Sequence, residues 1–449
     1  MEKSNLCSTE LDGTTDQATA RIRIPYETAE DRGVYLDLEL DGHNLAATFI
    51  PEEQAEIPDI RSAVAAAVEN PVAGKKLSEL LAGAGKVAII TENQFRQAPV
   101  AEIGLDLLQK SKASGASVAI IIGCGKVPPL SPEEIAEKLG SAVVDSGVEI
   151  FCNDVSKPEN YVFKGITKAG VAVSVHKAVA EADVILTVST TQATLWGYGG
   201  SGMIIPAVSS NDTIEYNHIL ALAPDCIPGN NECLMQLDKY EAARIVGVTM
   251  GINLIVNNQF EVTYVNAGSF EKAHREAIKI YDQVYRFDAA VLQKDKADIV
   301  ITGSSAPTNH LFFHTGWAAM NCMPIVKQGG TIIFASPCPG YHGWTGFALM
   351  DLLKPFMPAT QENHEKVLQS FYDKKSELWA GCIWYKVYVA MMHADLYIVT
   401  LPENLEMARD IGLTAFETVE EAYQAALKKQ GQDARVAFVP YGRYSVLDA

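Results

Sequence analysis

The feature that most constrains the fold of this chain is a regular alternation of short apolar runs with helical patterns, which begins near Leu77. A strand buried on both faces is a continuous apolar run, whereas a covering helix repeats apolar residues three or four positions apart. The apolar runs are 86–91, 117–123, 148–152, 171–175 and 183–189, with helical patterns at 100–113 and 132–139. This alternation predicts a mostly parallel sheet covered by helices.

A second series of the same kind follows Asp288, with strands predicted at 297–302, 331–336, 396–400 and 436–440. The charged residues 294–296 separate the two series and indicate a boundary at 285–296. Residues 20–57 alternate apolar and polar side chains, which is typical of antiparallel strands. We therefore predict an α/β protein with two Rossmann-like domains (20–288 and 289–449), an N-terminal antiparallel β-ribbon and a polar tail (1–19).

Charge and composition exclude several classes of protein. The 449 residues carry 36 basic and 55 acidic side chains, a net charge of −19. Nucleic acids and anionic membrane surfaces are bound by clustered Lys and Arg, so neither is an expected partner. No apolar run approaches the ~20 residues of a membrane-spanning helix, and residues 1–20 lack the apolar core of a signal peptide. The eight Cys have no CxxC spacing, so we expect reduced thiols and a cytoplasmic protein. The oligomeric state stays open.

Ligand sites in such domains lie beyond the carboxyl ends of the parallel strands. Arg96 follows the first strand, where its guanidinium could bind a carboxylate or phosphate, or pair at the surface with Glu92 or Glu102. The next loop, 123–129, has Pro128 in place of the third glycine of a dinucleotide-binding motif, so we reject that motif. Lys126 in this loop is a candidate anion contact; the alternative is a solvated lysine.

A glycine-rich loop follows the strand 183–189. It contains Gly197, Gly199, Gly200 and Gly202, whose backbone N–H groups could surround an anion. The loop lacks the order of a Walker motif. A flexible turn is the alternative, but Trp196 and Tyr198 favour a binding loop. His218 lies 16 residues beyond Gly202, and a single histidine at such a place is either a ligand or a structural residue.

The second domain offers a histidine pair and another glycine-rich loop. His310 and His314 are four residues apart after a predicted strand, so on a helix both would share one face, with Trp317 one turn beyond. Such a pair could bind a metal ion or move protons, although the HExxH context is absent. The loop 337–344 carries His342 and also follows a strand.

Taken in order, these segments resemble the lactate racemase (LarA) family of nickel-dependent 2-hydroxyacid racemases and epimerases. The family's D-x-x-R-P motif corresponds to Asn93–Arg96 with Pro99 beyond, and its glycine loop to 197–206. Its T-I-x-x-N-H motif corresponds to 213–218, and the elements around 253–257, 268, 273–274, 307–317 and 338–343 agree in order. The resemblance covers nearly the whole chain and implies the same fold.

The resemblance also implies a chemistry. In the family a nickel ion is held by a pincer nucleotide, which is made from nicotinate mononucleotide and joined covalently to a loop lysine. A histidine ligates the nickel, and two further histidines exchange the hydroxyl proton of the substrate. Here His218 keeps the nickel-ligand position and Arg96 the substrate position, with Asn93, Trp317 and Trp379 as further substrate contacts. The cofactor loop corresponds to five residues: Tyr198, Gly199, Gly200, Ser201 and Gly202.

Several of the family's chemical positions differ in this chain. The anchoring lysine falls at Gly202 or Met203, and the two proton-exchanging histidines fall at Val127 and at Ala193 or Gln192. The substrate-contacting lysine of the second domain falls at Trp317. The resemblance therefore implies a pincer nucleotide that is not covalently anchored, or none at all.

Three hypotheses follow for the function. The first is a divergent racemase or epimerase of hydroxyacids or sugar acids that uses other acid–base groups, namely Lys126, His310, His314 or His342. The second is a nickel-independent isomerase or lyase on the same scaffold. The third is a non-catalytic binder of an organic acid or a nucleotide.

Overall fold

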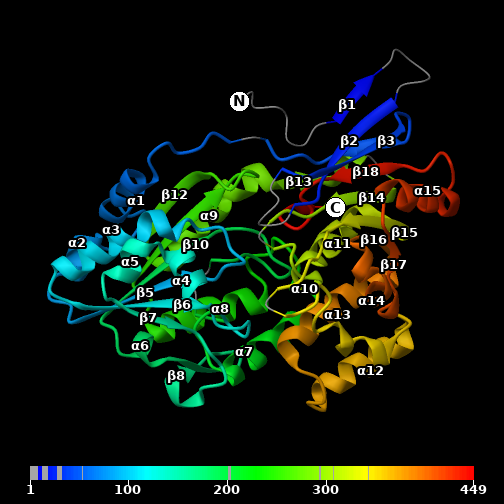
Figure 1. Ribbon diagram of the computed structural model, residues 1–449. Helices are drawn as coiled ribbons and strands as arrows, with labels where there is room; N and C mark the ends of the chain where they lie inside the picture. The colour runs from blue at the N-terminus through cyan, green and yellow to red at the C-terminus, as the bar shows by residue number, and fades with distance from the viewer. Residues whose placement is uncertain are drawn as a thin grey trace. The chain divides into compact units, whose positions relative to one another are not determined.

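A computed structural model of the chain describes residues 9–12, 19–27, 33–52, 54–200, 204–292, 295–306, 308–341 and 343–448 (Figure 1). The chain divides into two compact units. The central unit is Glu52–Val284, and the terminal unit combines Met1–Pro51 with Tyr285–Ala449. Each unit has its own six-stranded, mostly parallel sheet, so the predicted α/β class is confirmed. Among the described residues, no helix combines the length and apolarity that crossing a membrane requires.

The sheet of the central unit has the strand order β12-β11-β10-β5-β6-β7, in which only β12 is antiparallel to its neighbour. Its strands are β5 (Lys86–Glu92), β6 (Ser117–Gly123), β7 (Glu149–Cys152), β10 (Val184–Thr190), β11 (Met250–Val256) and β12 (Val262–Gly268). The central strands are buried on both faces, which explains why they are continuous apolar runs.

Helices and one hairpin surround this sheet. The helices are α1 (Ile60–Glu69), α2 (Leu77–Leu81), α3 (Val100–Ala113), α4 (Pro132–Leu139), α5 (Ser141–Asp145), α6 (Lys177–Ala180), α7 (Asn211–His218), α8 (Leu234–Val246) and α9 (Phe270–Tyr285). The hairpin joins β8 (Tyr161–Ile166) to β9 (Ala172–His176). The prediction that 171–175 forms a strand of the parallel sheet is therefore wrong. Its apolar residues Val171, Val173 and Val175 instead cover the core of the sheet from one side.

The terminal unit has the strand order β17-β16-β15-β14-β18-β4, all parallel. These strands are β14 (Ala297–Gly303), β15 (Val326–Ala335), β16 (Asp395–Val399), β17 (Thr414–Phe416), β18 (Val436–Val439) and β4 (Leu45–Thr48). A short pair, β13 (Arg286–Asp288) and β19 (Val446–Asp448), lies apart from the sheet. The helices are α10 (Phe312–Thr315), α11 (Trp317–Cys322), α12 (Gln361–Tyr372), α13 (Leu378–His393), α14 (Leu405–Asp410) and α15 (Val419–Gln430).

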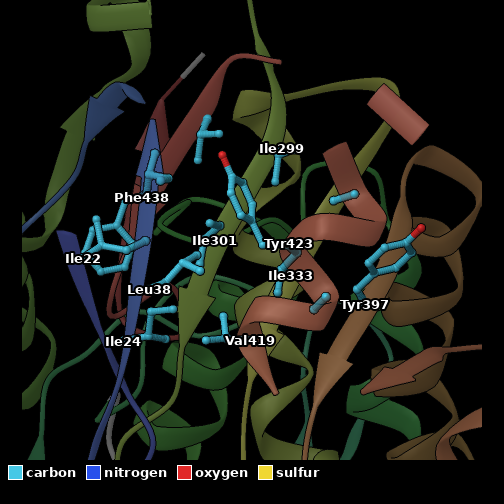
Figure 2. Close-up of a cluster of buried hydrophobic side chains, with 14 of the residues drawn as sticks. Ile22, Ile24, Leu38, Ile299, Ile301, Ile333, Tyr397, Val419, Tyr423 and Phe438 are labelled. Atoms are coloured by element: carbon cyan, nitrogen blue, oxygen red, sulfur yellow. The ribbon is translucent and has the colours of Figure 1, made fainter. Parts of the chain in front are cut away.

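The predicted N-terminal ribbon is present as β2 (Thr19–Pro25) and β3 (Tyr35–Asp41), which pair antiparallel. The prediction of a tail over 1–19 is wrong for β1 (Thr9–Asp12), because this strand pairs antiparallel with β2. Residues 28–32, between β2 and β3, lie outside the described residues. The assignment of residues 20–51 to the first domain is wrong, because β4 pairs with β18 in the sheet of the terminal unit. Figure 2 shows the physical reason: Ile22, Ile24 and Leu38 of the ribbon pack into one buried cluster with Ile301 and Phe438.

The contact between the ribbon and β14 gives a first prediction. A side chain added at Gly303 would overlap the carbonyl oxygen of Pro25 and lie 2.9 Å from Ile24 Cγ2. We expect Gly303→Ala to lower the free energy of unfolding by about 1–3 kcal/mol, as overpacking of a core does. Denaturant unfolding measures this change. Gly85→Ala is the control, since its nearest neighbour is the carboxylate end of Asp183 at 3.3 Å. Equal unfolding midpoints for the two variants would contradict the close packing of ribbon and sheet.

Candidate functional site

The site of the central unit begins where neighbouring parallel strands end. β5 lies between β6 and β10, so the loops 93–99, 124–131 and 191–200 leave the sheet at the same edge. These loops contain most of the candidates predicted from the sequence in the central unit. The structure allows each of them to be placed by its contacts.

A buried carboxylate, Glu92, organises the Arg96 loop. Its Oε1 accepts a hydrogen bond from the backbone N–H of Ala98 at 2.8 Å, and its Oε2 accepts one from the N–H of Thr190 at 2.8 Å. The hydroxyl of Thr190 donates to the same carboxylate at 3.0 Å. Glu92 therefore ties the end of β5 to the end of β10. Sequence reasoning considered it only as a surface partner of Arg96, although an acidic residue closing an apolar strand was a usable signal.

Arg96 is half-buried in this loop, and its Nη1 donates to the carbonyl of Phe95 at 2.9 Å. Asn93 has a local role, because its Oδ1 accepts the N–H of Phe95 at 3.1 Å and so shapes the turn. Lys138 on α4 donates to the carbonyls of Arg96 and Ala98 at 3.1 and 3.3 Å. Burial lowers the pKa of Lys138, and the charge of Arg96 adds to that effect. Two basic groups thus lie at one loop.

Lys126 is not the solvated lysine of the alternative interpretation. Its Nζ lies 2.6 Å from Glu215 Oε1, and the two side chains are only 8% and 17% exposed. Glu215 belongs to α7, three residues before His218, which brings this ion pair to the histidine end of the helix. The pairing joins residues 89 positions apart, so a sequence pattern could not indicate it.

His218 is the last residue of α7 and is 2% exposed. Its Nδ1 lies 2.8 Å from the carbonyl of Ile214, and its ring meets Trp196 edge-on with the centroids 5.5 Å apart. Burial lowers the pKa of His218 to about 3, and the charges of Lys239 and Lys126 contribute to the same effect. The ring is therefore neutral at physiological pH. Because a carbonyl can only accept, Nδ1 carries the hydrogen and Nε2 carries a lone pair, the form of imidazole that ligates metals.

Backbone hydrogen bonds fix residues 192–199, the described first part of the glycine-rich loop. The N–H of Gly199 donates to Gln192 O at 2.8 Å, and the N–H of Thr194 donates to Gly197 O at 2.9 Å. Gly197 has φ of +86°, which suits glycine, and its own N–H donates to Ile227 O at 3.0 Å. For residues 192–199 these bonds argue against the flexible-turn alternative.

The side chain of Tyr198 is fully buried and directed at α9, where its hydroxyl donates to Asp282 and its ring packs against Tyr281. Any contact of Tyr198 with a ligand therefore involves its backbone. Gly199 and Gly200 follow it in the loop, and Gly200 has φ of +92°. Ser201 and Gly202, also predicted to bind the cofactor, lie outside the described residues.

In the terminal unit the predicted histidine pair is not on one helix face. Helix α10 starts at Phe312, and His310 lies in the turn before it, where its carbonyl accepts the N–H of Gly340 at 2.9 Å. The i, i+4 geometry expected for His310 and His314 is therefore wrong, since only His314 is helical. His314 meets the ring of Trp317 edge-on with the centroids 6.2 Å apart. His342 lies outside the described residues.

Aromatic side chains surround these positions. Trp379 on α13 packs against Phe313 with the ring centroids 4.8 Å apart, and it is 7% exposed. Sequence reasoning missed Arg443, whose fully buried guanidinium lies 4.3 Å from the ring centroid of Trp317 and 4.8 Å from that of Tyr444. An arginine directly after the last strand of a parallel sheet was an available signal.

The described residues contain no group of three or more His, Cys, Asp or Glu side chains able to hold a metal ion by themselves. A metal at His218 would therefore take most of its ligands from another molecule. His218 fits that role, with one nitrogen lone pair on a neutral, fixed ring.

Comparisons with known proteins identify the family. A model of the lactate racemase N-terminal domain matches residues 32–226, and a model of the lactate racemase C-terminal domain matches residues 292–447. The chain belongs to the lactate racemase family. The expected resemblance is thereby confirmed.

Two members of the lactate racemase family are similar along most of their length. The lactate racemase of Lactiplantibacillus plantarum is 24% identical, over 94% of this chain and 98% of its own. That of Thermoanaerobacterium thermosaccharolyticum is 25% identical, over 84% of this chain and 88% of its own. The structure of the lactate racemase apoprotein from T. thermosaccharolyticum has a TM-score of 0.85 at 22% identity, covering 96% of this chain and 100% of that one. This likeness supports the fold.

Proposed function

We propose that this chain is a racemase or epimerase of 2-hydroxyacids, sugar acids included, with an active site that has diverged from that of its relatives. Two similar proteins carry the name lactate racemase. The observation that carries the proposal is the state of His218: buried, neutral, and fixed by Ile214 O so that Nε2 is the free acceptor. That lone pair is what a metal ligand requires.

The family's nickel-pincer nucleotide fits this chain in part. It supplies a hydride acceptor when bound, and His218 would be its protein ligand. Covalent attachment does not fit, because the segment 190–218 contains no lysine. The family's two histidines fall at Val127 and at Ala193 or Gln192, and these buried side chains, two of them apolar and one an amide, exchange no protons. We therefore propose that the nucleotide binds non-covalently.

The remaining residues suit an organic anion. Arg96 has the fork geometry that binds a carboxylate through two parallel hydrogen bonds, which would orient the hydroxyacid. Lys126 forms a buried ion pair with Glu215 and stays a candidate for proton exchange with the substrate hydroxyl. His310, His314 and His342 stay further candidates.

The test is a chirality assay on protein made in cells that synthesise the pincer nucleotide. Single enantiomers of several 2-hydroxyacids and sugar acids are incubated with the protein and separated by chiral chromatography. Appearance of the opposite configuration supports the proposal. Loss of water or isomerisation without nickel would favour the isomerase or lyase hypothesis. Binding without any conversion would favour a non-catalytic binder, since neither Val127 nor Ala193 can act as a base.

The proposed role of Arg96 gives a second prediction. Arg96→Lys keeps the positive charge but loses the planar fork, so we expect KM, or the dissociation constant of a bound hydroxyacid, to rise at least about 10-fold. Arg61→Lys is the matched control, because Arg61 makes a two-bond pair with Asp106 on the surface of the same unit. Unchanged KM and kcat in Arg96→Lys would remove Arg96 from the site.

A further inference from the structure

Side chains beneath the glycine loop hold three consecutive carbonyl groups. Lys239 Nζ on α8 donates to Tyr198 O at 3.1 Å, and His274 Nε2 on α9 lies 2.6 Å from Gly199 O. Ser189 Oγ at the end of β10 donates to Gly200 O at 3.3 Å. Three different elements thus orient successive peptides of one loop.

The ring of His274 donates a hydrogen bond to the carbonyl of Gly199, as its protonation state and neighbours indicate. Burial lowers the pKa of His274 to about 3, so the ring is neutral and carries one N–H. Its Nε2 faces a carbonyl, which only accepts, so the hydrogen is on Nε2. Its Nδ1 lies 2.8 Å from the hydroxyl oxygen of Tyr240, which also lies 2.9 Å from Asn231 Oδ1. The contacts Tyr240–His274–Gly199 therefore connect α8 and α9 to the glycine loop.

Fixing these carbonyls also fixes the amide groups that share their peptides. In a trans peptide the N–H points opposite to the carbonyl. The Gly199 carbonyl is directed at His274, so the N–H of Gly200 points away from that support. This N–H makes no hydrogen bond to any described residue, although the other amides of the loop at 197–199 are paired. This amide is therefore an oriented donor with room in its hydrogen bonding for a bound anion.

Lys239 is unusual as a purely structural residue. It is 5% exposed, and within the described part of the chain its only hydrogen-bond acceptor is Tyr198 O. Burial lowers its pKa to about 8, even though Cys233, Cys226 and Asp238 nearby act in the opposite direction. Holding an ammonium in such surroundings reduces stability, and an apolar side chain of similar length would avoid that loss.

We propose that Lys239 is a positioning residue for an oxyanion bound at the glycine loop, where it orients the Tyr198 peptide and adds positive charge behind the Gly200 amide. This inference rests on the proposed role of the loop in binding a cofactor. The bound group would be a phosphate, either free or part of a nucleotide. In a chain of net charge −19, a buried ammonium is a local source of the positive potential that such a ligand needs.

The experiment uses the full chain and two probes, inorganic sulfate and nicotinic acid mononucleotide, with affinities measured by titration calorimetry. We expect Lys239→Met to bind at least one probe at least about 10-fold more weakly. Its thermal midpoint should equal or exceed that of the wild type. If Lys239→Met binds both probes more weakly, the site accepts any oxyanion. If it binds only the mononucleotide more weakly, the site accepts a nucleotide phosphate. The control is Lys164→Met, because Lys164 also donates to a backbone carbonyl, Ala180 O at 3.1 Å, in the same unit.

Two further variants separate charge from hydrogen bonding. Lys239→Arg should keep affinity within a few-fold of the wild type, whereas Lys239→Gln should lose it. Wild-type affinity in both Lys239→Met and Lys239→Gln would overturn the inference while leaving the proposed function standing. Equal weakening in Lys239→Arg and Lys239→Met, with lower thermal midpoints in both, would also overturn it, by showing a merely structural role. If the wild type binds neither probe, the inference fails together with the proposed role of the loop.

Discussion

Replacing His218 with alanine is expected to reduce nickel retention at least about 100-fold in protein made with the pincer nucleotide. Removing the hydrogen-bonded partners of a metal ligand already weakens metal binding by about 10- to 100-fold, and here the ligand itself is lost. The described residues offer no cluster of His, Cys, Asp or Glu that could replace it. Elemental analysis after desalting measures the nickel content per chain.

His176→Ala is the matched control for this variant. His176 is also 2% exposed, lies in the same unit, and has a pKa lowered by burial. Its ring has a structural role, because Nδ1 accepts the N–H of Ala178 at the start of α6. We expect this variant to lose stability but keep nickel. Equal nickel content in the two variants would show that His218 is not the ligand.

The second large effect is expected at Glu92. Glu92→Ala leaves the N–H groups of Ala98 and Thr190 without their acceptor and leaves the nearby Lys138 without a compensating charge. We expect the free energy of unfolding to fall by about 3–5 kcal/mol, the range for removing one member of a buried charged network. Denaturant unfolding followed by circular dichroism measures the change.

The control for Glu92 is Glu181→Ala, which removes an exposed ion pair with Lys86 in the same unit. Pairs of this kind contribute little, so its unfolding midpoint should match the wild type. Glu92→Gln keeps the shape and one acceptor oxygen, so we expect an intermediate loss. If Glu92→Ala were as stable as Glu181→Ala, the carboxylate would not organise the Arg96 loop.

Local sequence patterns predicted the positions of most strands well, but they did not predict which strands pair with one another. The run 117–123 coincides with β6, because a central parallel strand is apolar on both faces and ends at turn residues. The ribbon at 19–41 was also visible as alternation. Its place in the terminal unit was not, because strand pairing such as that of β4 with β18 joins segments nearly 400 residues apart. Nothing in a local pattern specifies the partner that buries its apolar face.

For the candidate site, too, the location could be predicted from the sequence but the contacts of its residues could not. The loops after β5, β6 and β10 could be singled out because ligands gather at that edge of a parallel sheet. The surroundings of the residues could not, since Lys126 meets Glu215 and His274 meets Gly199 only through the fold. For His310 the local pattern gave a wrong prediction. Its spacing from His314 suggested that both lie on one helix, but α10 starts at Phe312, two residues after His310. Buried charges such as Lys239 gave no local signal at all.

The most direct test of the account compares native and denaturing mass spectra of the wild-type protein made with the pincer nucleotide. We expect the native spectrum to contain one nickel and one nucleotide per chain. The denaturing spectrum should show the unmodified polypeptide, because the loop has no lysine to hold the nucleotide covalently. A nucleotide adduct that survives denaturation, or a native protein with neither metal nor nucleotide, would contradict the account.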